Sequence, residues 1–460
     1  MYNDHGDWPN SSSLLHAKGT TLEKIRQLTH TLQQFSLPLI LGVLAGLILA
    51  NLDEHLYHQI VDYPLLGDSA TLFGHKITFH FIINDIFMLF FFGIAAKEIT
   101  ESALPGGALN PIKKAINPLL GTLGGVLGPI IVFFILAGLL YTDSMSAFAD
   151  ALGKSFVPGG SYADSDPAAI FRGWGVPTAT DIALAWLVAR MVFGNGHPAV
   201  NFLLLLAVAD DAIGLGIIAV FYPNPSHPVE PIWLLLVAAG MVAAFLLRKQ
   251  GVKSWVAYIF IGGTLSWVGL LMASLHPALA LVPIVPFLPG PRHDTGLFEE
   301  PGPKDLNKDG IPDADNVPHE HHGHSPLEQF EHQLKLFVDM GLFFFAFANA
   351  GVSFGTINGV TWIILASLVI GKTLGVTTLS LLGEKAGFPL PTGMSKRHLF
   401  TAGIIAGLGL TVALFVSGEA YSAAGPFQGP AKMGAVFSAG AALLAFAVGK
   451  ALKVKGDRGH

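Results

Sequence analysis

Long apolar runs dominate the hydropathy pattern of this chain, and short polar segments separate them. Twelve runs carry few or no charged residues, and most have about the 17–25 residues that a helix needs to cross a bilayer. The pattern predicts an all-α polytopic membrane protein with about twelve transmembrane helices. The eighth run is the shortest and the richest in proline. The runs cover residues 36–52, 81–99, 117–141, 174–194, 198–221, 231–248, 254–272, 276–288, 334–354, 361–383, 399–419 and 432–450.

The distribution of positive charge supports this count and indicates an orientation. If the N-terminus is cytoplasmic, 21 of the 26 Lys and Arg residues fall in cytoplasmic segments and Lys372 falls within a helix. The other four, on outer segments, are Lys76, Lys154, Arg172 and Lys432. Because Lys and Arg concentrate in the cytoplasmic loops of membrane proteins, we expect both termini in the cytoplasm and the chain in the inner (plasma) membrane.

Composition excludes several classes of protein. Only 13% of the residues are charged and 52% are hydrophobic, whereas about 25% of a soluble domain is charged. The formal net charge is −6, and no dense Lys/Arg patch is present to neutralise the phosphates of a nucleic acid. With no cysteine, the chain has no disulfide, thiolate metal site or cysteine nucleophile. The expected partner of its surface is the lipid bilayer.

Two polar segments carry patterns of their own. Leu22, Ile25 and Leu28 recur at helical spacing and predict an amphipathic helix on the cytoplasmic surface. In residues 63–80, apolar and polar residues alternate, and this pattern predicts a small β-hairpin on the outer face. The predicted order is an amphipathic segment at 1–35, transmembrane helices one to eight at 36–288, a flexible acidic and His-rich cytoplasmic loop at 289–333, helices nine to twelve at 334–450 and a basic cytoplasmic tail at 451–460.

The 289–333 loop contains a partial calcium-loop pattern. Asp305, Asn307 and Asp309 resemble the start of such a loop, but Asn316 stands where the bidentate glutamate belongs. The histidines at 319–324 could bind a transition metal or titrate near neutral pH. A solvated, variable loop is the favoured interpretation.

Four ionisable residues lie near the middle of apolar runs, where a charge is costly and needs a partner or a purpose. They are Asp181, Asp210, Asp211 and Lys372. Neighbours on a helix point about 100° apart, so one aspartate of the dyad can pair with a cation while the other faces a water-filled cavity. Two adjacent carboxylates repel each other, and their oxygens suit Na⁺ and Li⁺. The dyad is therefore a candidate site that holds either a proton or an alkali cation.

Two runs contain helix-breaking sequences. Residues 176–180 (VPTAT) precede Asp181, and the other break is the glycine-rich stretch at 403–411. Matching breaks in two halves of a chain indicate a mid-membrane ion site in transporters built from inverted repeats. Helices three to five and ten to twelve would be the related triplets. Asp181 could offset two facing helix N-termini, and Lys372 two facing C-termini.

Several segments resemble the NhaA-type Na⁺/H⁺ antiporters of bacteria, in the order found in that family. They are PTATDIALA, AVADDAIG, FAFANAGVSF, IGKTLG and GLGLTVALF, and the resemblance covers about residues 30–450. It implies electrogenic exchange of Na⁺ or Li⁺ for protons by alternating access. This activity exports sodium, serves pH and sodium homeostasis and salt tolerance, and uses no cofactor. It also implies homodimers formed through the outer hairpin.

The resemblance assigns roles to residues at matching positions. Asp211 matches the main cation- and proton-carrying carboxylate, and Asp210 matches the aspartate that is partnered by the lysine of helix ten, here Lys372. Thr180 and Asp181 match the helix-four residues at the crossing of the two unwound segments.

The end of helix two departs from the family pattern. The best-known members carry Glu-Val-Lys-Arg-Glu there, whereas this chain reads Ala-Ala-Lys-Glu-Ile over residues 95–99. The family's pH-sensing cluster also includes the start of helix nine. The pH-response candidates in this chain are therefore Lys97, Glu98, Glu331 and His332.

Other classes fit less well. An intramembrane aspartyl protease needs Gly-x-Gly-Asp, but Gly407-Leu408-Gly409 is followed by Leu410, and a prenyl transferase needs a third aspartate where Gly214 stands. We therefore expect no enzyme. A cation-coupled symporter or an ion channel on the same fold remains the alternative, and a non-transporting sensor is a third possibility.

Overall fold

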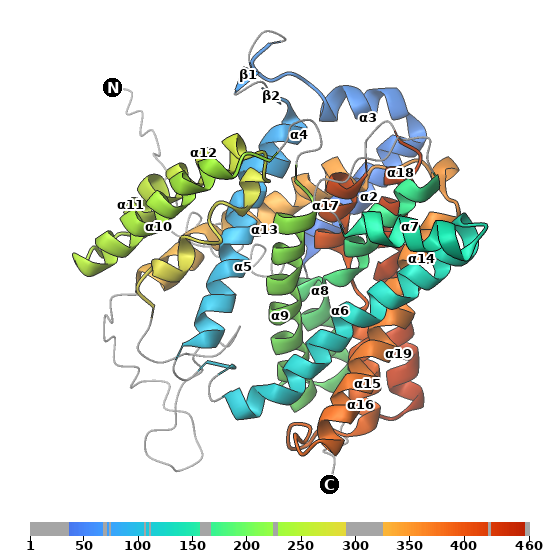
Figure 1. The fold of residues 1–460 in the computed structure, drawn as a ribbon. Coiled ribbons are helices and arrows are strands. Elements are labelled where there is room, and N and C mark those ends of the chain that lie inside the picture. Colours follow the sequence, from blue (N-terminus) through green and yellow to red (C-terminus); the bar gives the residue numbers. More distant parts are fainter. Residues whose placement is uncertain are drawn as a thin grey trace, which may run out of the picture.

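The computed structural model describes residues 36–67, 71–72, 75–104, 107–109, 112–156, 167–223, 229–290, 325–421 and 425–455. The described chain is a bundle of helices (Figure 1). The predicted amphipathic helix within 1–35, the partial calcium pattern and the histidines at 319–324 lie outside these residues.

The fold class is confirmed as an all-helical, polytopic membrane protein. Within the described residues, eight helices are long and apolar enough to cross a membrane, or ten if each of two bent pairs is one span. These ten correspond to ten of the twelve predicted runs. The eight are Phe79–Ala103, Ala115–Tyr141, Pro198–Phe221, Pro231–Lys249, Trp255–Met272, Pro326–Ala350, Gly359–Lys385 and Gln428–Ala451, and the bent pairs are Ala169–Thr178 with Ile182–Phe193 and Lys396–Ala406 with Leu410–Ala420.

Segments of π-helix or 3-10 helix subdivide several of these spans. The first half of the chain forms α2 (Leu37–Leu52), α3 (Glu54–Val61), α4 (Phe79–Phe81), η1 (Ile82–Phe87), α5 (Met88–Ala103), α6 (Ile112–Tyr141), α7 (Met145–Ser155), η2 (Pro167–Thr178), α8 (Ile182–Phe193), α9 (Pro198–Phe221), η3 (Pro231–Trp233) and α10 (Leu234–Lys249). The second half forms α11 (Trp255–Ala257), η4 (Tyr258–Gly263), α12 (Thr264–Met272), η5 (Pro277–Leu279), η6 (Val285–Phe287), α13 (Pro326–Ala350), η7 (Phe354–Thr356), α14 (Gly359–Ala366), η8 (Ser367–Gly371), α15 (Lys372–Lys385), α16 (Lys396–Ala406), α17 (Leu410–Ala420), α18 (Gln428–Phe437), η9 (Ser438–Gly440) and α19 (Ala441–Ala451).

The prediction of a transmembrane helix at 276–288 was wrong. This segment forms the two short turns η5 and η6. Prolines at 277, 283 and 286 lack the N–H groups that an α-helix requires. The segment still runs along α5 (Figure 1) and ends where Gly290 packs against Leu104. No α-helix therefore forms over residues 276–288, and the segment ends beside the start of α13, where the Leu327 N–H donates to the Pro289 carbonyl at 3.2 Å.

The boundary between the loop and helix nine was also wrong. We expected the loop to extend to residue 333, but α13 begins at Pro326. Ser325 Oγ accepts the Glu328 N–H at 3.3 Å, and the Glu328 carboxylate accepts the Ser325 N–H at 2.7 Å. This capping box starts a helix in polar sequence, where the hydropathy pattern gives no sign of one.

Glycines bring α6 and α15 close together. A Cβ added at Gly128 would lie 2.9 Å from the Gly375 Cα, and one added at Gly371 would lie 2.6 Å from the Pro129 Cα. Close approach of this kind is how membrane helices pack without a hydrophobic driving force. It places Lys372, the first residue of α15, in the centre of the bundle with no exposed surface.

A two-stranded hairpin projects beyond α4 at one end of the molecule, and α15 and α16 lie at the other end (Figure 1). Thr71–Leu72 (β1) pairs antiparallel with His75–Lys76 (β2), and an isolated bridge joins Pro64 to Thr78. This pairing lies within the 63–80 segment that alternates in the sequence.

Candidate ion-binding site

Two broken helices meet in the middle of the bundle. The chain bends by 49° between η2 and α8 and by 44° between α16 and α17. The backbone N–H of Asp181, in the first break, donates to the Leu408 carbonyl, in the second, at 2.6 Å. Through this hydrogen bond, one break partly satisfies the free backbone N–H and carbonyl groups of the other. The breaks lie in the second helix of each predicted triplet.

Asp181 links the two breaks through its side chain. Its Oδ1 accepts the Leu184 N–H at 3.0 Å, and its Oδ2 accepts the Thr411 N–H at 3.2 Å. Leu184 is in the first turn of α8 and Thr411 is in the first turn of α17. A carboxylate at two helix N-termini supplies missing acceptors and opposes both helix dipoles. The side chain therefore faces two N-termini, as its position in the sequence suggested.

Lys372 reaches the crossing from α15. Its Nζ donates to Asp210 Oδ2 at 2.7 Å and to Thr180 Oγ1 at 2.8 Å. The Thr180 hydroxyl lies 2.9 Å from both Asp210 Oδ2 and the Ala406 carbonyl, the last of α16. We expected Lys372 itself to face two helix C-termini. Instead, the Thr180 hydroxyl contacts the C-terminus of α16, and Lys372 pairs with Asp210.

Asp211 and the second oxygen of Asp210 are the unsatisfied part of this site. Both aspartates lie on α9, with 0% of Asp210 and 6% of Asp211 exposed. Within the described residues, Oδ1 of each is buried without a hydrogen-bond partner. A Cβ at Gly125 would lie 3.4 Å from Asp210 Oδ1, so this glycine leaves room beside the carboxylate. Buried carboxylate oxygens without donors are suited to a proton or a hard cation.

The candidate pH-response residues gather at the C-terminal end of α5 and the start of α13. Lys97 pairs with Glu101 at 2.7 Å and with Glu331, which comes from α13. Glu98 is 8% exposed on the same turn of α5. His332 follows Glu331 on α13. Glu101 was missed, although its spacing of four residues from Lys97 is the usual spacing of a helical ion pair.

A second polar set that the sequence reasoning missed lies toward the hairpin end. His276 Nε2 lies 3.3 Å from Glu419 Oε1, and Asn349 Nδ2 donates to Asn84 Oδ1 at 2.8 Å. Glu419 lies near the end of α17. Each of these residues lies within a predicted apolar run, but nothing in the local sequence indicates its partner.

Comparison with known proteins decides the family. The model of the family described as Na+/H+ antiporter 1 matches residues 26–152 and 141–451. This chain belongs to the NhaA Na⁺/H⁺ antiporter family. The candidate site described above therefore lies in a member of a transporter family.

Individual NhaA relatives match almost end to end. The Na(+)/H(+) antiporter NhaA of Geobacter sulfurreducens is 50% identical over 431 residues, which are 94% of this chain and 99% of that protein. The NhaA of Desulfitobacterium hafniense is 52% identical over 425 residues, covering 92% and 96% of the two chains. The NhaA of Jannaschia sp. is 37% identical over 452 residues, covering 92% and 97%.

Proposed function

We propose that this member of the NhaA family exports Na⁺ or Li⁺ in exchange for protons at the Asp210–Asp211 dyad. The observation that carries this proposal is the buried, unpartnered Oδ1 atom on each aspartate, next to the Lys372–Asp210 pair and the crossing of two broken helices. The cargo is Na⁺ or Li⁺ and H⁺, and the proposal requires no cofactor.

The exchange follows from competition for the same oxygens. Lys372 compensates the charge of Asp210, whereas Asp211 has no cation at hydrogen-bond distance among the described residues. A proton on Asp211 removes the negative charge that a cation needs, and a bound cation displaces the proton. Na⁺ and H⁺ therefore bind alternately, and exchange is electrogenic when the numbers of protons and cations differ.

In alternating access, a conformational change opens the loaded dyad first to one membrane face and then to the other. The half-helices α8 and α17 start at the same carboxylate, Asp181, so a movement of one break is transmitted to the other. In the proposed orientation, both termini are cytoplasmic and the chain spans the inner membrane. Na⁺ is then loaded from the cytoplasm and released on the hairpin side.

Dissipation of ΔpH in everted membrane vesicles tests the proposal. Vesicles that contain the wild-type protein should lose ΔpH when Na⁺ or Li⁺ is added, and Asp211→Asn should abolish the response while the folded protein remains in the membrane. Asp150→Asn, on the exposed Lys154–Asp150 pair, is the matched control. A response of Asp211→Asn equal to wild type would refute the role of the dyad. ΔpH loss that requires an added organic solute would favour a symporter, and uncoupled Na⁺ flux would favour a channel.

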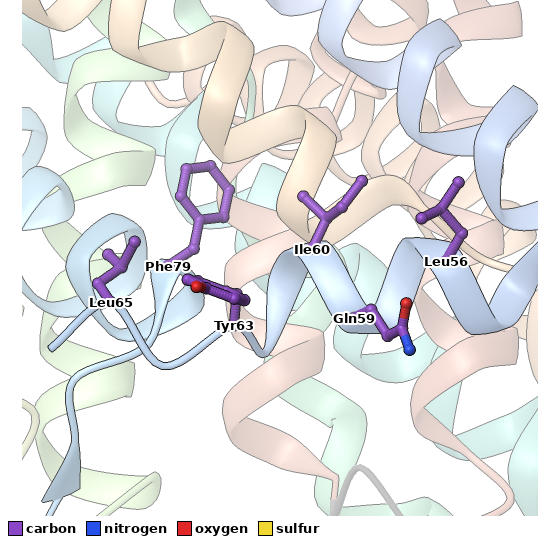
Figure 2. Close-up of a pocket in the computed structure, with 6 residues that line it drawn as sticks. All are labelled: Leu56, Gln59, Ile60, Tyr63, Leu65 and Phe79. Carbon is purple, nitrogen blue, oxygen red and sulfur yellow. The ribbon is translucent and has the colours of Figure 1, made fainter. Parts of the chain in front are cut away.

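We also propose that the hairpin region forms a homodimer contact. An open apolar hollow between α3 and the start of α4 is lined by Leu56, Gln59, Ile60, Tyr63, Leu65 and Phe79 (Figure 2). Tyr63 is 59% exposed and Leu66, beside the hollow in sequence, is 67% exposed. Large exposed apolar groups at the end of a bundle are typical of association surfaces.

Cysteine cross-linking tests the dimer, because the natural chain has no cysteine. Lys76→Cys, on β2, should give a disulfide-linked dimer in membranes under mild oxidation. Val242→Cys, an exposed position on α10, should not. Equal cross-linking at both positions would mean random collision and would refute the proposed contact.

The pH response is proposed to depend on Lys97, Glu98, Glu331 and His332. The Lys97–Glu331 pair joins α5 to α13, and Glu98 is buried beside it. A change of protonation there alters a contact between two spanning helices. Glu98→Gln should change the pH profile of exchange, and an unchanged profile would exclude Glu98 from the response.

A further inference from the structure

Two buried histidines lie against each other at the end of the bundle away from the hairpin. His197 caps α9 and His398 lies in the first turn of α16, with 8% and 0% of each residue exposed. Their ring centroids are 4.4 Å apart and the ring planes are tilted by 38°. The ring of Phe193, the last residue of α8, lies 5.8 Å from both. The pair therefore joins the ends of three helices that carry the ion site and its breaks.

Both rings accept hydrogen bonds from the backbone. His197 Nδ1 accepts the Ala199 N–H at 3.1 Å, and His398 Nδ1 accepts the Ser395 N–H at 3.0 Å. Because a backbone N–H can only donate, each Nδ1 is unprotonated. The Ser395 hydroxyl also lies 2.7 Å from His398 Nδ1, and His398 Nε2 lies 3.1 Å from the Val454 carbonyl. Only a neutral His398 with its proton on Nε2 satisfies all of these contacts.

Protonation of the pair would disrupt this arrangement in three ways. A proton on Nδ1 removes the acceptor that caps α9 or α16. The new positive charge stands at a helix N-terminus, where the helix dipole is also positive. With both rings charged, like charges meet within a buried ring contact. The contacts around the histidine pair therefore stabilise its neutral form and destabilise its charged form.

The surroundings of the pair are mainly basic. Asp210 and Asp211 are on α9 too, but roughly 20 Å further along the helix. The helices of the pair, α8, α9 and α16, pack against one another and against α5, α6, α15 and α19. The charged residues on these elements include Arg190 on α8, Lys97, Glu98 and Glu101 on α5, Lys113 on α6, Lys372, Glu384 and Lys385 on α15, Lys396 and Arg397 on α16, and Lys450, Lys453 and Lys455 on and after α19. Glu384 lies 3.9 Å from Lys396.

We propose that His197 and His398 are positioning residues that form a pH-sensitive clasp. The neutral pair holds the ends of α8, α9 and α16 together, and protonation opens it and slows transport. The effect on transport rests on the proposed antiport function, whereas the effect on stability does not.

Thermal melting of the purified protein between pH 5.5 and 8.5 tests the clasp independently of transport. The hydrogen bonds of the folded state require neutral rings, so acidification should lower the melting temperature of wild type more than that of a variant without the pair. The double variant His197→Asn, His398→Gln keeps hydrogen-bond acceptors and cannot titrate. On acidification, the melting temperature of this variant should fall by about 2–4 °C less than that of wild type. The control His58→Gln, at an exposed position on α3, should keep the wild-type slope. A wild-type slope in the folded double variant would overturn the clasp.

Exchange measured against pH tests the link to transport. The double variant should keep the wild-type rate at pH 8.5, and its acidic midpoint should fall by about one pH unit. A flattened melting slope with an unchanged exchange profile would overturn the link to transport. If the double variant does not fold, each single variant should give part of both shifts, and no shift in either would overturn the proposal. Absence of Na⁺-dependent exchange in wild type would refute the proposed function and leave the melting test intact.

Discussion

Lys372 Nζ and Asp210 Oδ2 lie 2.7 Å apart, and neither side chain has any exposed surface. The lysine is the first residue of α15 and the aspartate is in the middle of α9, so the pair ties two helices together at the ion site. Removing one member of a buried pair leaves the other charge without compensation. The proposed ion binding is therefore linked to stability through the same two side chains.

Lys372→Ala should lower the free energy of unfolding by about 3–5 kcal/mol, the usual cost of an orphaned buried charge. The measurement is thermal or denaturant unfolding of the purified protein, beside the exchange rate in vesicles. Lys154→Ala, which breaks the exposed pair with Asp150, should cost only about 0–1 kcal/mol. Equal melting temperatures for Lys372→Ala and wild type would contradict the importance of the buried pair.

Asp181→Ala should destabilise both half-helices that begin at this residue. The loss is expected to be about 1 kcal/mol for each cap, because the N–H groups of Leu184 and Thr411 lose their acceptor. Asp181→Asn retains one side-chain acceptor and should lie between wild type and Asp181→Ala in melting temperature. If the asparagine and alanine variants both have the melting temperature of wild type, the double cap does not contribute to stability.

Sodium binding to the wild-type protein should release protons, because cation and proton compete for the oxygens of Asp210 and Asp211. Isothermal titration with NaCl, in two buffers of different ionisation enthalpy at one pH, counts the protons released. Asp211→Asn should show neither the sodium heat nor the release, and Asp150→Asn should match wild type. Sodium heat that is independent of the buffer in the wild-type protein would rule out the competition.

Gly128→Ala should push α6 and α15 apart, because its Cβ would lie 2.9 Å from the Gly375 Cα. Overpacking of this kind costs about 1–3 kcal/mol, and exchange should fall because Lys372 moves away from Asp210. Gly216→Ala is the matched control on α9, since a Cβ there meets no atom within 4 Å. It should leave stability unchanged or raise it slightly. Similar melting of the two variants would contradict the proposed close packing.

Two errors in the predicted elements show the limits of hydropathy. The apolar run at 276–288 has the composition of a span, but its prolines remove backbone donors and turn it into η5 and η6. The polar stretch before residue 334 seemed to belong to the loop, but a capping box starts α13 at Pro326. In both cases local backbone hydrogen bonding, rather than hydrophobicity, decided whether a helix formed.

The sequence by itself determined the membrane class, ten of the spans, the two helix breaks and the four ionisable residues near the middle of apolar runs, because each of these is a local property of composition, periodicity or backbone chemistry. Only the tertiary structure decided which groups meet. Asp181 and Thr411 are 230 residues apart, yet they share one hydrogen bond, and Thr180 rather than Lys372 reaches the carbonyl of Ala406. Such contacts depend on how α6, α9 and α15 pack. That packing is a sum of many long-range interactions, and no short segment of the chain contains it.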